Sequence, residues 1–147
     1  MSTTLPWESD VVEEILPHRS PMLWVDRVMA LDLEAPSILA WKLIRPTESW
    51  VQGHFPDRPI VPGIFLLEAM AQAGGLLLHA LGYDKTALFL SITGAKFRRS
   101  VHPNDALYLY VRALHVSSRG SRMEGRVLID DVELACESEF SLAMVSQ

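Results

Sequence analysis

Apolar and polar positions alternate along much of the second half of the chain, and this pattern predicts β-strands. Four strand-like stretches follow one another there: TALFLSITGAKFRRSV (86–101), ALYLYVRALHVSS (106–118), RMEGRVLIDD (122–131) and VELACESEFSLAMV (132–145). Alternation is clearest in the later stretches, and it places apolar side chains on one face of a sheet. The segments SSRGS and DD are typical of hairpin turns, so these strands are expected to pair antiparallel.

The first half of the chain predicts a short helix, two more strands and a loop. Residues 8–16 have an amphipathic pattern that ends before Pro17, which favours a short helix. The segments MLWVDRVMALDL (22–33) and SILAWKLI (37–44) are strand-like and flank the turn-like EAPS. Residues 46–62 contain four prolines and one glycine, so an ordered irregular loop is expected there.

One long apolar segment runs from Gly63 to about Leu81 and stops at Gly82, which predicts a single long helix. A helix that is apolar on nearly every side must be surrounded by protein. The antiparallel strands are therefore expected to form one curved sheet around it, an α+β arrangement in a single domain spanning residues 1–147. Polar members of the segment, Glu68 among them, are costly in lipid, so no membrane insertion is expected.

Composition narrows the class of protein. A hydrophobic fraction of 49% argues against a disordered chain. The single Cys136 excludes an intrachain disulfide and a cysteine metal cluster. The N-terminus is acidic and lacks the pattern of a signal peptide, so a reducing, cytoplasmic location fits best.

Charge is distributed unevenly along the chain. Residues 85–126 hold eight basic and two acidic side chains, so this segment carries +6 while the remainder carries −11. These basic residues could simply be solvated charges scattered over the surface. Alternatively, they could form a basic face that binds an acidic partner. No helix-turn-helix, zinc-finger or aromatic ribonucleoprotein pattern occurs, so nucleic acid is not the expected partner.

Glu68 is the one carboxylate of the apolar segment IFLLEAMAQAGGLLLHAL, and Gln72 follows it one helical turn later on the same face. A buried, unpaired carboxylate is costly. Pairing with an arginine such as Arg27 would make Glu68 an inert structural group. Otherwise, a desolvated carboxyl keeps its proton closer to neutral pH, as a general acid requires.

The start of the helix and the preceding loop supply two further candidates. Pro62 and Gly63 offer no side-chain cap, so unless solvent or backbone caps them, the first amides suit a carbonyl oxygen that becomes an oxyanion. His54 lies in the proline-braced loop, where a histidine is most often structural, but a neutral imidazole accepts a proton. A base, an acid and an oxyanion site together indicate proton abstraction beside a carbonyl, with loss of a β leaving group. The other histidines lack a second ligand at metal spacing, so no metal is expected: His18, His79, His102 and His115.

Three blocks of the sequence resemble a known family. LPHRSPMLWVDRV, QGHFPDRPIVPGIFLLEAMAQAGG and AKFRRSVHPNDAL are similar, in the same order, to the signature blocks of the FabZ-type (3R)-3-hydroxyacyl-(acyl carrier protein) dehydratases. The resemblance covers nearly the whole chain, and the middle block is highly specific. It implies the hot-dog fold, in which a curved antiparallel sheet wraps a long central helix.

The resemblance also implies a role for each candidate residue. His54 and Glu68 would be the catalytic pair. The amide of Gly63 would meet the thioester carbonyl, and Gln72 would orient the acid. The family forms homodimers, or oligomers of dimers, with two sites that each take the histidine from one subunit and the glutamate from the other.

The same resemblance implies a partner. The substrate would be carried on the phosphopantetheine of an acidic acyl carrier protein, with no other cofactor. Lys96, Arg98 and Arg99 match the family's KFRR stretch near the tunnel mouth, so they would contact the carrier.

The chain departs from the family pattern at several positions outside the catalytic ones. Asp57 stands where HFPG would have glycine, and His102 and Asn104 interrupt the usual VVPGD. Thr93 and Gly94 replace more polar residues before AKFRR. These differences bear on chain length, carrier choice and pathway, so a specialised acyl or polyene pathway stays open beside general fatty acid synthesis.

Other functions also stay open on the sequence. A hot-dog thioesterase would need a water-activating carboxylate, and it usually lacks the spacing between His54 and Glu68. A non-catalytic acyl-binding module would not need the intact histidine, glutamate and glycine. A dehydratase that also isomerises the double bond usually carries aspartate at the Glu68 position.

Overall fold

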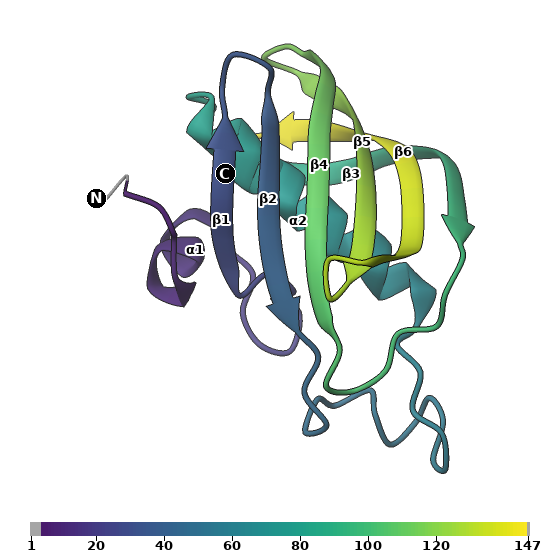
Figure 1. Cartoon of the computed structure of the whole chain (residues 1–147). Helices are drawn as coiled ribbons and strands as arrows, with labels where there is room; N and C mark the ends of the chain where they lie inside the picture. The colour runs from purple at the N-terminus through teal and green to yellow at the C-terminus, as the bar shows by residue number, and fades with distance from the viewer. Residues whose placement is uncertain (1–3, 147) are drawn as a thin grey trace.

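In the computed structural model, which describes residues 4–146, one six-stranded sheet curves around a long helix (Figure 1). The elements are α1 (Ser9–Ile15), β1 (Arg27–Asp32), β2 (Ser37–Leu43), α2 (Gly63–Ala80), β3 (Thr86–Phe97), β4 (Ala106–Val116), β5 (Gly120–Ile129) and β6 (Glu133–Val145). The predicted loop over residues 46–62 joins β2 to α2 and hangs below the sheet in Figure 1. The predicted helices, strands and loop are therefore confirmed apart from the start of β1.

The sheet order is β1-β2-β4-β5-β6-β3, and every neighbouring pair is antiparallel. At the β5–β6 turn Asp130 and Asp131 both have positive φ, 53° and 60°, as a two-residue type I′ turn requires. At the β4–β5 turn the Ser117 amide donates to the Gly120 carbonyl at 2.9 Å. Both predicted hairpin turns are thus present.

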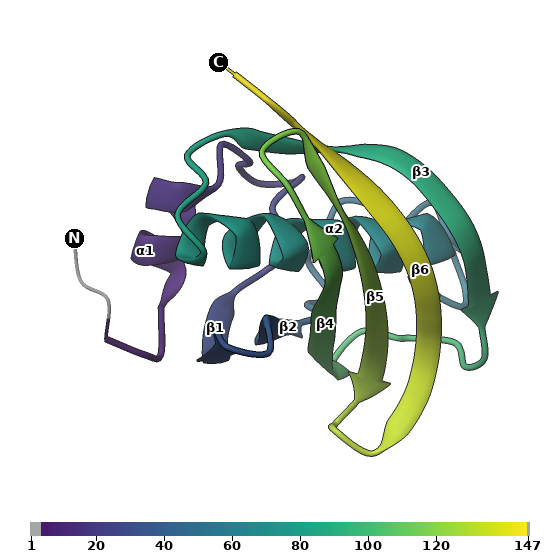
Figure 2. The ribbon, with the colours of Figure 1, turned by 90° about the horizontal axis from the view of Figure 1, so that it is seen from above.

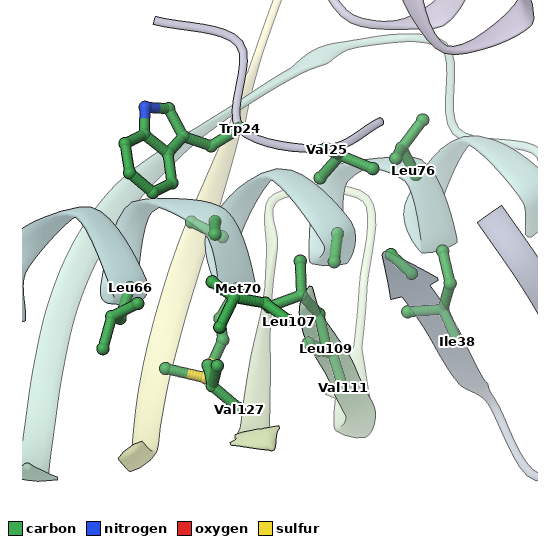
Figure 3. Close-up of a cluster of buried hydrophobic side chains, with 14 of the residues drawn as sticks. Trp24, Val25, Ile38, Leu66, Met70, Leu76, Leu107, Leu109, Val111 and Val127 are labelled. Carbon is green, nitrogen blue, oxygen red and sulfur yellow. The ribbon is translucent and has the colours of Figure 1, made fainter. Parts of the chain in front are cut away.

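Helix α2 lies in the curve of the sheet, as the view from above shows (Figure 2). In Figure 3, Met70 extends from α2 toward buried side chains of β4 and β5. Glycines allow this close approach: a Cβ at Gly125 would stand 2.7 Å from the Met70 sulfur, and one at Gly74 would stand 2.7 Å from the Met123 sulfur. Each large apolar side chain buried here stabilises the fold by about 1.5–3 kcal/mol.

The segment before β1 is not a strand over residues 22–26, contrary to the prediction. Here the amide of Trp24 donates to Gln72 Oε1 at 2.7 Å, and Gln72 Nε2 donates to the Met22 carbonyl at 2.8 Å. A side chain of α2 therefore satisfies backbone groups that a neighbouring strand would otherwise satisfy. The strand starts at Arg27 instead.

Strand β3 differs from the other strands because most of its residues are exposed. It is the last strand of the sheet, hydrogen-bonded to β6 on one side only. Its exposed apolar side chains include Leu88, Leu90, Ile92 and Phe97. A long apolar edge of this kind is a ready site for pairing with another chain.

The architecture is the hot-dog fold that the family resemblance implied. Helix α2 is long and apolar enough to cross a membrane by length and composition, yet 56% of that window is buried inside the protein. Its end is also confirmed, since Gly82 adopts a positive φ of 102° just after it. The apolar character of α2 is therefore explained by its place at the centre of the sheet.

Candidate active site

Glu68 faces a cavity of about 530 Å³ beside α2. One face of the helix lines it with Glu68, Gln72, Gly75 and His79. The opposite wall comes from the segment around His18 and from the first half of β3. The carboxyl lines the cavity with about a quarter of its side chain exposed, so it is open to a ligand.

Gln72 holds Glu68 in one orientation. Its Nε2 donates to Glu68 Oε2 at 2.8 Å, and the same amide group bonds the backbone at Met22 and Trp24. Gln72 is only 2% exposed, so its own side chain is shielded from water. The alternative of an inert pair with Arg27 is wrong, because Arg27 Nε donates to Glu8 Oε1 at 3.0 Å.

His54 is fixed within the loop that precedes α2. Its ring Nδ1 lies 2.6 Å from the carbonyl oxygen of Ile60. The Ile60 amide in turn donates to the His54 carbonyl at 2.8 Å. Because a carbonyl only accepts, Nδ1 carries the proton, and in the neutral ring Nε2 has a free lone pair. This is the form in which an imidazole can take a proton.

The start of α2 has no side-chain cap. Pro62 makes no side-chain cap, and the Gly63 amide has no hydrogen-bond acceptor in residues 4–146. A Cβ at Gly63 would stand 2.7 Å from Phe97 Cε1, so any larger residue would displace that ring. An uncapped amide at the positive end of a helix suits a developing oxyanion.

One chain does not bring all four residues to one cavity. Glu68 and Gln72 line the cavity beside α2, and neither His54 nor Gly63 is among its lining residues. His54 and Gly63 lie instead at the loop end of the helix, where the Val61 amide donates to the Val101 carbonyl at 2.8 Å. Glu68 and His54 therefore occupy separate places within a single chain.

The basic residues near the end of β3 are partly neutralised. Arg98 forms an ion pair with Glu137, and Arg99 Nε lies 2.8 Å from Glu133 Oε2. Lys96 is exposed and forms no ion pair with residues 4–146. Charge counted along residues 85–126 thus overstates the basic character of the surface.

Among the departures from the family pattern, Asn104 has a structural explanation. Its φ of 77° is the left-handed conformation that glycine usually supplies, and asparagine tolerates it better than most residues.

Metal chemistry has no support in residues 4–146, where no three His, Cys, Asp or Glu side chains cluster as ligands would. His18 also lines the cavity, although sequence reasoning did not assign it to the site; the signal available was its place in the first signature block.

The chain is similar in sequence to known proteins. A family model described as a FabA-like domain matches residues 16–139. A 3-hydroxyacyl-(acyl-carrier-protein) dehydratase FabZ of Protochlamydia amoebophila is 47% identical over 90% of this chain and 86% of its own length. Proteins of the same name from Chlamydia pneumoniae and Campylobacter concisus are 43% and 42% identical, over 91% and 94% of this chain and 90% and 99% of theirs.

Solved structures share the fold at low sequence identity. The dehydratase heterocomplex ApeI:P from Xenorhabdus doucetiae matches with a TM-score of 0.79 at 16% identity, covering 98% of this chain and 93% of that one. A hypothetical thioesterase from Streptococcus pneumoniae, crystallised with coenzyme A, matches with a TM-score of 0.63 at 15% identity, covering 82% and 85%. With nine-tenths of its length aligned to enzymes that share more than two-fifths of its residues, the chain belongs to the FabA-like family and, within it, to the FabZ-type dehydratases.

Proposed function

We propose that this enzyme removes water from (3R)-3-hydroxyacyl thioesters of an acyl carrier protein, giving trans-2-enoyl thioesters. The C2–H and C3–O bonds break, the C2=C3 double bond forms, and the hydroxyl leaves as water. The proposal rests on two side chains that are each held in one orientation, one able to accept a proton and the other able to donate one. The His54 ring has a free Nε2, and the Glu68 carboxyl is held by Gln72.

His54 is the base in this proposal. Its Nε2 takes the C2 proton, while the Nδ1 hydrogen bond to Ile60 keeps the ring oriented and stabilises the imidazolium that forms. The Gly63 amide, uncapped at the start of α2, donates to the thioester oxygen as negative charge develops there.

Glu68 is the acid that protonates the leaving hydroxyl. Gln72 binds Oε2, so Oε1 is the oxygen without a hydrogen-bond partner in residues 4–146. The Glu68 side chain is about a quarter exposed and lines the cavity, so the carboxyl can be reached from there. Gln72 is a positioning residue here, since it contacts Glu68 and the backbone rather than substrate.

Each complete site is shared between two subunits. Glu68 opens to a cavity that lacks His54 and Gly63, so a second copy of the chain is needed to supply them. The exposed apolar edge of β3 is the surface that supports this pairing, with Leu90 69% exposed and Phe97 53% exposed. Two-fold symmetry would then create two equivalent sites.

The acyl carrier protein delivers the substrate on its phosphopantetheine arm, and the reaction needs no other cofactor. Lys96, Arg98 and Arg99 are proposed to contact the acidic carrier, with Lys96 the least neutralised of the three. The setting is cytoplasmic, in fatty acid synthesis or a related acyl or polyene pathway.

The test is incubation of the protein with 3-hydroxyacyl and trans-2-enoyl carrier-protein thioesters of several chain lengths. We expect interconversion of the two, seen by absorbance and by water addition, without release of free thiol. Free thiol would identify a thioesterase instead. No change with any chain length would identify an acyl-binding module.

A further inference from the structure

His18 lies against the carboxyl that the proposed reaction uses as its acid. The Nε2 of His18 is 3.6 Å from Glu68 Oε2, and both side chains line the same cavity. Resting on the proposed function, we propose that His18 is a second positioning residue for Glu68. Together with Gln72 it holds Oε2, so that Oε1 is the oxygen that carries and donates the proton.

The backbone at His18 is held in place by its neighbour. Arg19 Nη1 donates to the carbonyls of His18 and Leu16 at 2.7 and 2.9 Å, and Arg19 Nη2 donates to the Glu13 carbonyl at 2.9 Å. These acceptors include carbonyls at the end of α1, which otherwise lack partners. The Arg19 side chain is held by these carbonyls and by the Glu13 carboxylate, whose Oε1 lies 3.3 Å from Nε, and His18 is therefore presented to the cavity from a fixed position.

The unpartnered nitrogen of His18 indicates which way its ring is protonated. Its Nδ1 is buried and has no hydrogen-bond partner in residues 4–146. A buried N–H without an acceptor is rare and costly, whereas an unfilled acceptor is tolerated better. The neutral ring therefore carries its proton on Nε2, the nitrogen that faces Glu68.

Two side-chain nitrogens that carry hydrogen then lie near one carboxyl oxygen. Gln72 Nε2 donates to Glu68 Oε2 at 2.8 Å, and His18 Nε2 approaches the same atom. The distance of 3.6 Å exceeds a hydrogen bond, and catalytic contacts often shorten when substrate closes the site. As Oε1 gives its proton to the leaving hydroxyl, both donors hold the carboxylate that results.

The remaining charged groups of the cavity lie farther along it. His79 is eleven residues beyond Glu68 on α2, which corresponds to about 16 Å along the helix axis. Asp84 and Lys85 line the cavity near that end, after α2. His18 is therefore the titratable group that contacts the Glu68 carboxyl.

The kinetic test compares two substitutions of His18 with one substitution of a histidine outside the site. His18→Phe keeps the ring shape without nitrogen, His18→Gln keeps an N–H at about the reach of Nε2, and exposed His115→Gln is the matched control. We expect His18→Phe to lower kcat about 10-fold with KM within about twofold, since hydrogen bonds to charged groups are worth that much. His18→Gln should recover most of kcat, and His115→Gln should match the parent.

Repeating the His18→Phe substitution in the Glu68→Gln protein separates a positioning role from a general loss of structure. Because His18 acts through Glu68, His18→Phe should cause no further loss in Glu68→Gln. An equal loss in both backgrounds, a loss confined to KM, or the same loss in His18→Gln would overturn the proposal. If His18→Phe does not fold, His18→Asn takes its place, since its amide is too short to reach Oε2.

Tautomer measurement tests the contact without turnover. In protein labelled with ¹⁵N at histidine, the His18 ring should show the Nε2–H tautomer, and its signals should shift in Glu68→Gln. The Nδ1–H tautomer, or unchanged signals in Glu68→Gln, would overturn the role of His18. An inactive parent enzyme with the Nε2–H tautomer would instead refute the proposed reaction and leave the contact standing.

Discussion

Glu68 is a carboxyl fixed by one amide and exposed to one cavity, and this arrangement makes its chemistry testable. Glu68→Gln keeps the shape and the contact with Gln72 but removes the acid. General acids typically contribute about 10²–10⁴-fold, so we expect turnover to fall on that scale. Steady-state rates with a carrier-bound substrate measure this, with exposed Glu34→Gln as the control. Turnover close to the parent would show that Glu68 is structural.

Cys136 shows how burial controls a group outside the site. Its side chain is fully buried, and burial raises the pKa of the thiol from 9.0 to about 11. The native protein should therefore resist thiol-specific reagents at pH 8 and react on unfolding. Rapid labelling without denaturant would contradict this.

The same shift predicts the direction of a pH effect on stability. Because the folded pKa of Cys136 lies above the unfolded value, its contribution is complete below pH 9.0 and is lost as the pH rises toward about 11. The unfolding free energy of a Cys136→Ala variant should fall less across that window than that of the parent. A parallel decline of both proteins would show that Cys136 does not contribute.

At the residue scale, the sequence predicted contacts that follow from local geometry. Spacing of four residues on a helix was enough to predict that Glu68 and Gln72 meet. It could not show that Arg27 pairs with Glu8, or that His18 reaches Glu68. Both contacts join segments distant in sequence, and their geometry exists only once the chain has folded.

Close packing between elements depends on a few glycines, and Gly120 is the tightest. A Cβ there would stand 2.5 Å from the backbone carbonyl oxygen of Leu142, which cannot rotate away. Gly120→Ala should therefore lower the unfolding free energy by about 1–3 kcal/mol, as overpacking does. Denaturant titration measures the change.

Gly75→Ala is the matched control for that substitution. A Cβ at Gly75 would meet only ordinary contacts, at 3.6 Å from Leu16 and 3.7 Å from Ala87, and alanine favours a helix. Its unfolding free energy should equal or exceed that of the parent. Equal destabilisation by both changes would mean that the carbonyl of Leu142 is not the cause.

At the element scale, the spacing of apolar residues predicted the strands and α2 well, because that spacing follows the pattern of burial along each element. Strand β2 alternates regularly between buried and half-buried residues, and α2 is mostly buried. Residues 22–26 were mispredicted because a side chain, Gln72, replaced a strand as their hydrogen-bond partner. Local pattern carries no information about such a replacement.

Over the whole molecule, charge on the surface differs from charge along the chain. Arg98 pairs with Glu137 and Arg99 with Glu133, so two acidic residues from outside residues 85–126 neutralise two of the basic side chains of that segment. Lys96 stays exposed without an ion pair in residues 4–146. The proposed carrier contact is therefore best tested at Lys96, where a substitution breaks no ion pair with residues 4–146.

Lys96→Glu should raise KM for a carrier-bound substrate far more than for a short pantetheine thioester. The difference should shrink as salt rises, because exposed charges are screened within about 10 Å at 0.1 M. Exposed Arg122→Glu on β5 provides a charge-matched control. Equal losses with both substrates would remove Lys96 from the carrier surface.

The shared site is the claim on which the proposed function depends most, because one chain separates His54 from Glu68. The most direct measurement mixes two inactive homodimers, His54→Ala and Glu68→Ala, and allows their subunits to exchange. Random exchange makes about half of the dimers mixed, each with one intact site, so activity should recover to about a quarter of the parent's by two-fold symmetry. If both groups acted within one chain, every site in the mixture would lack one of them. No recovery, with subunit exchange shown independently, would contradict the account.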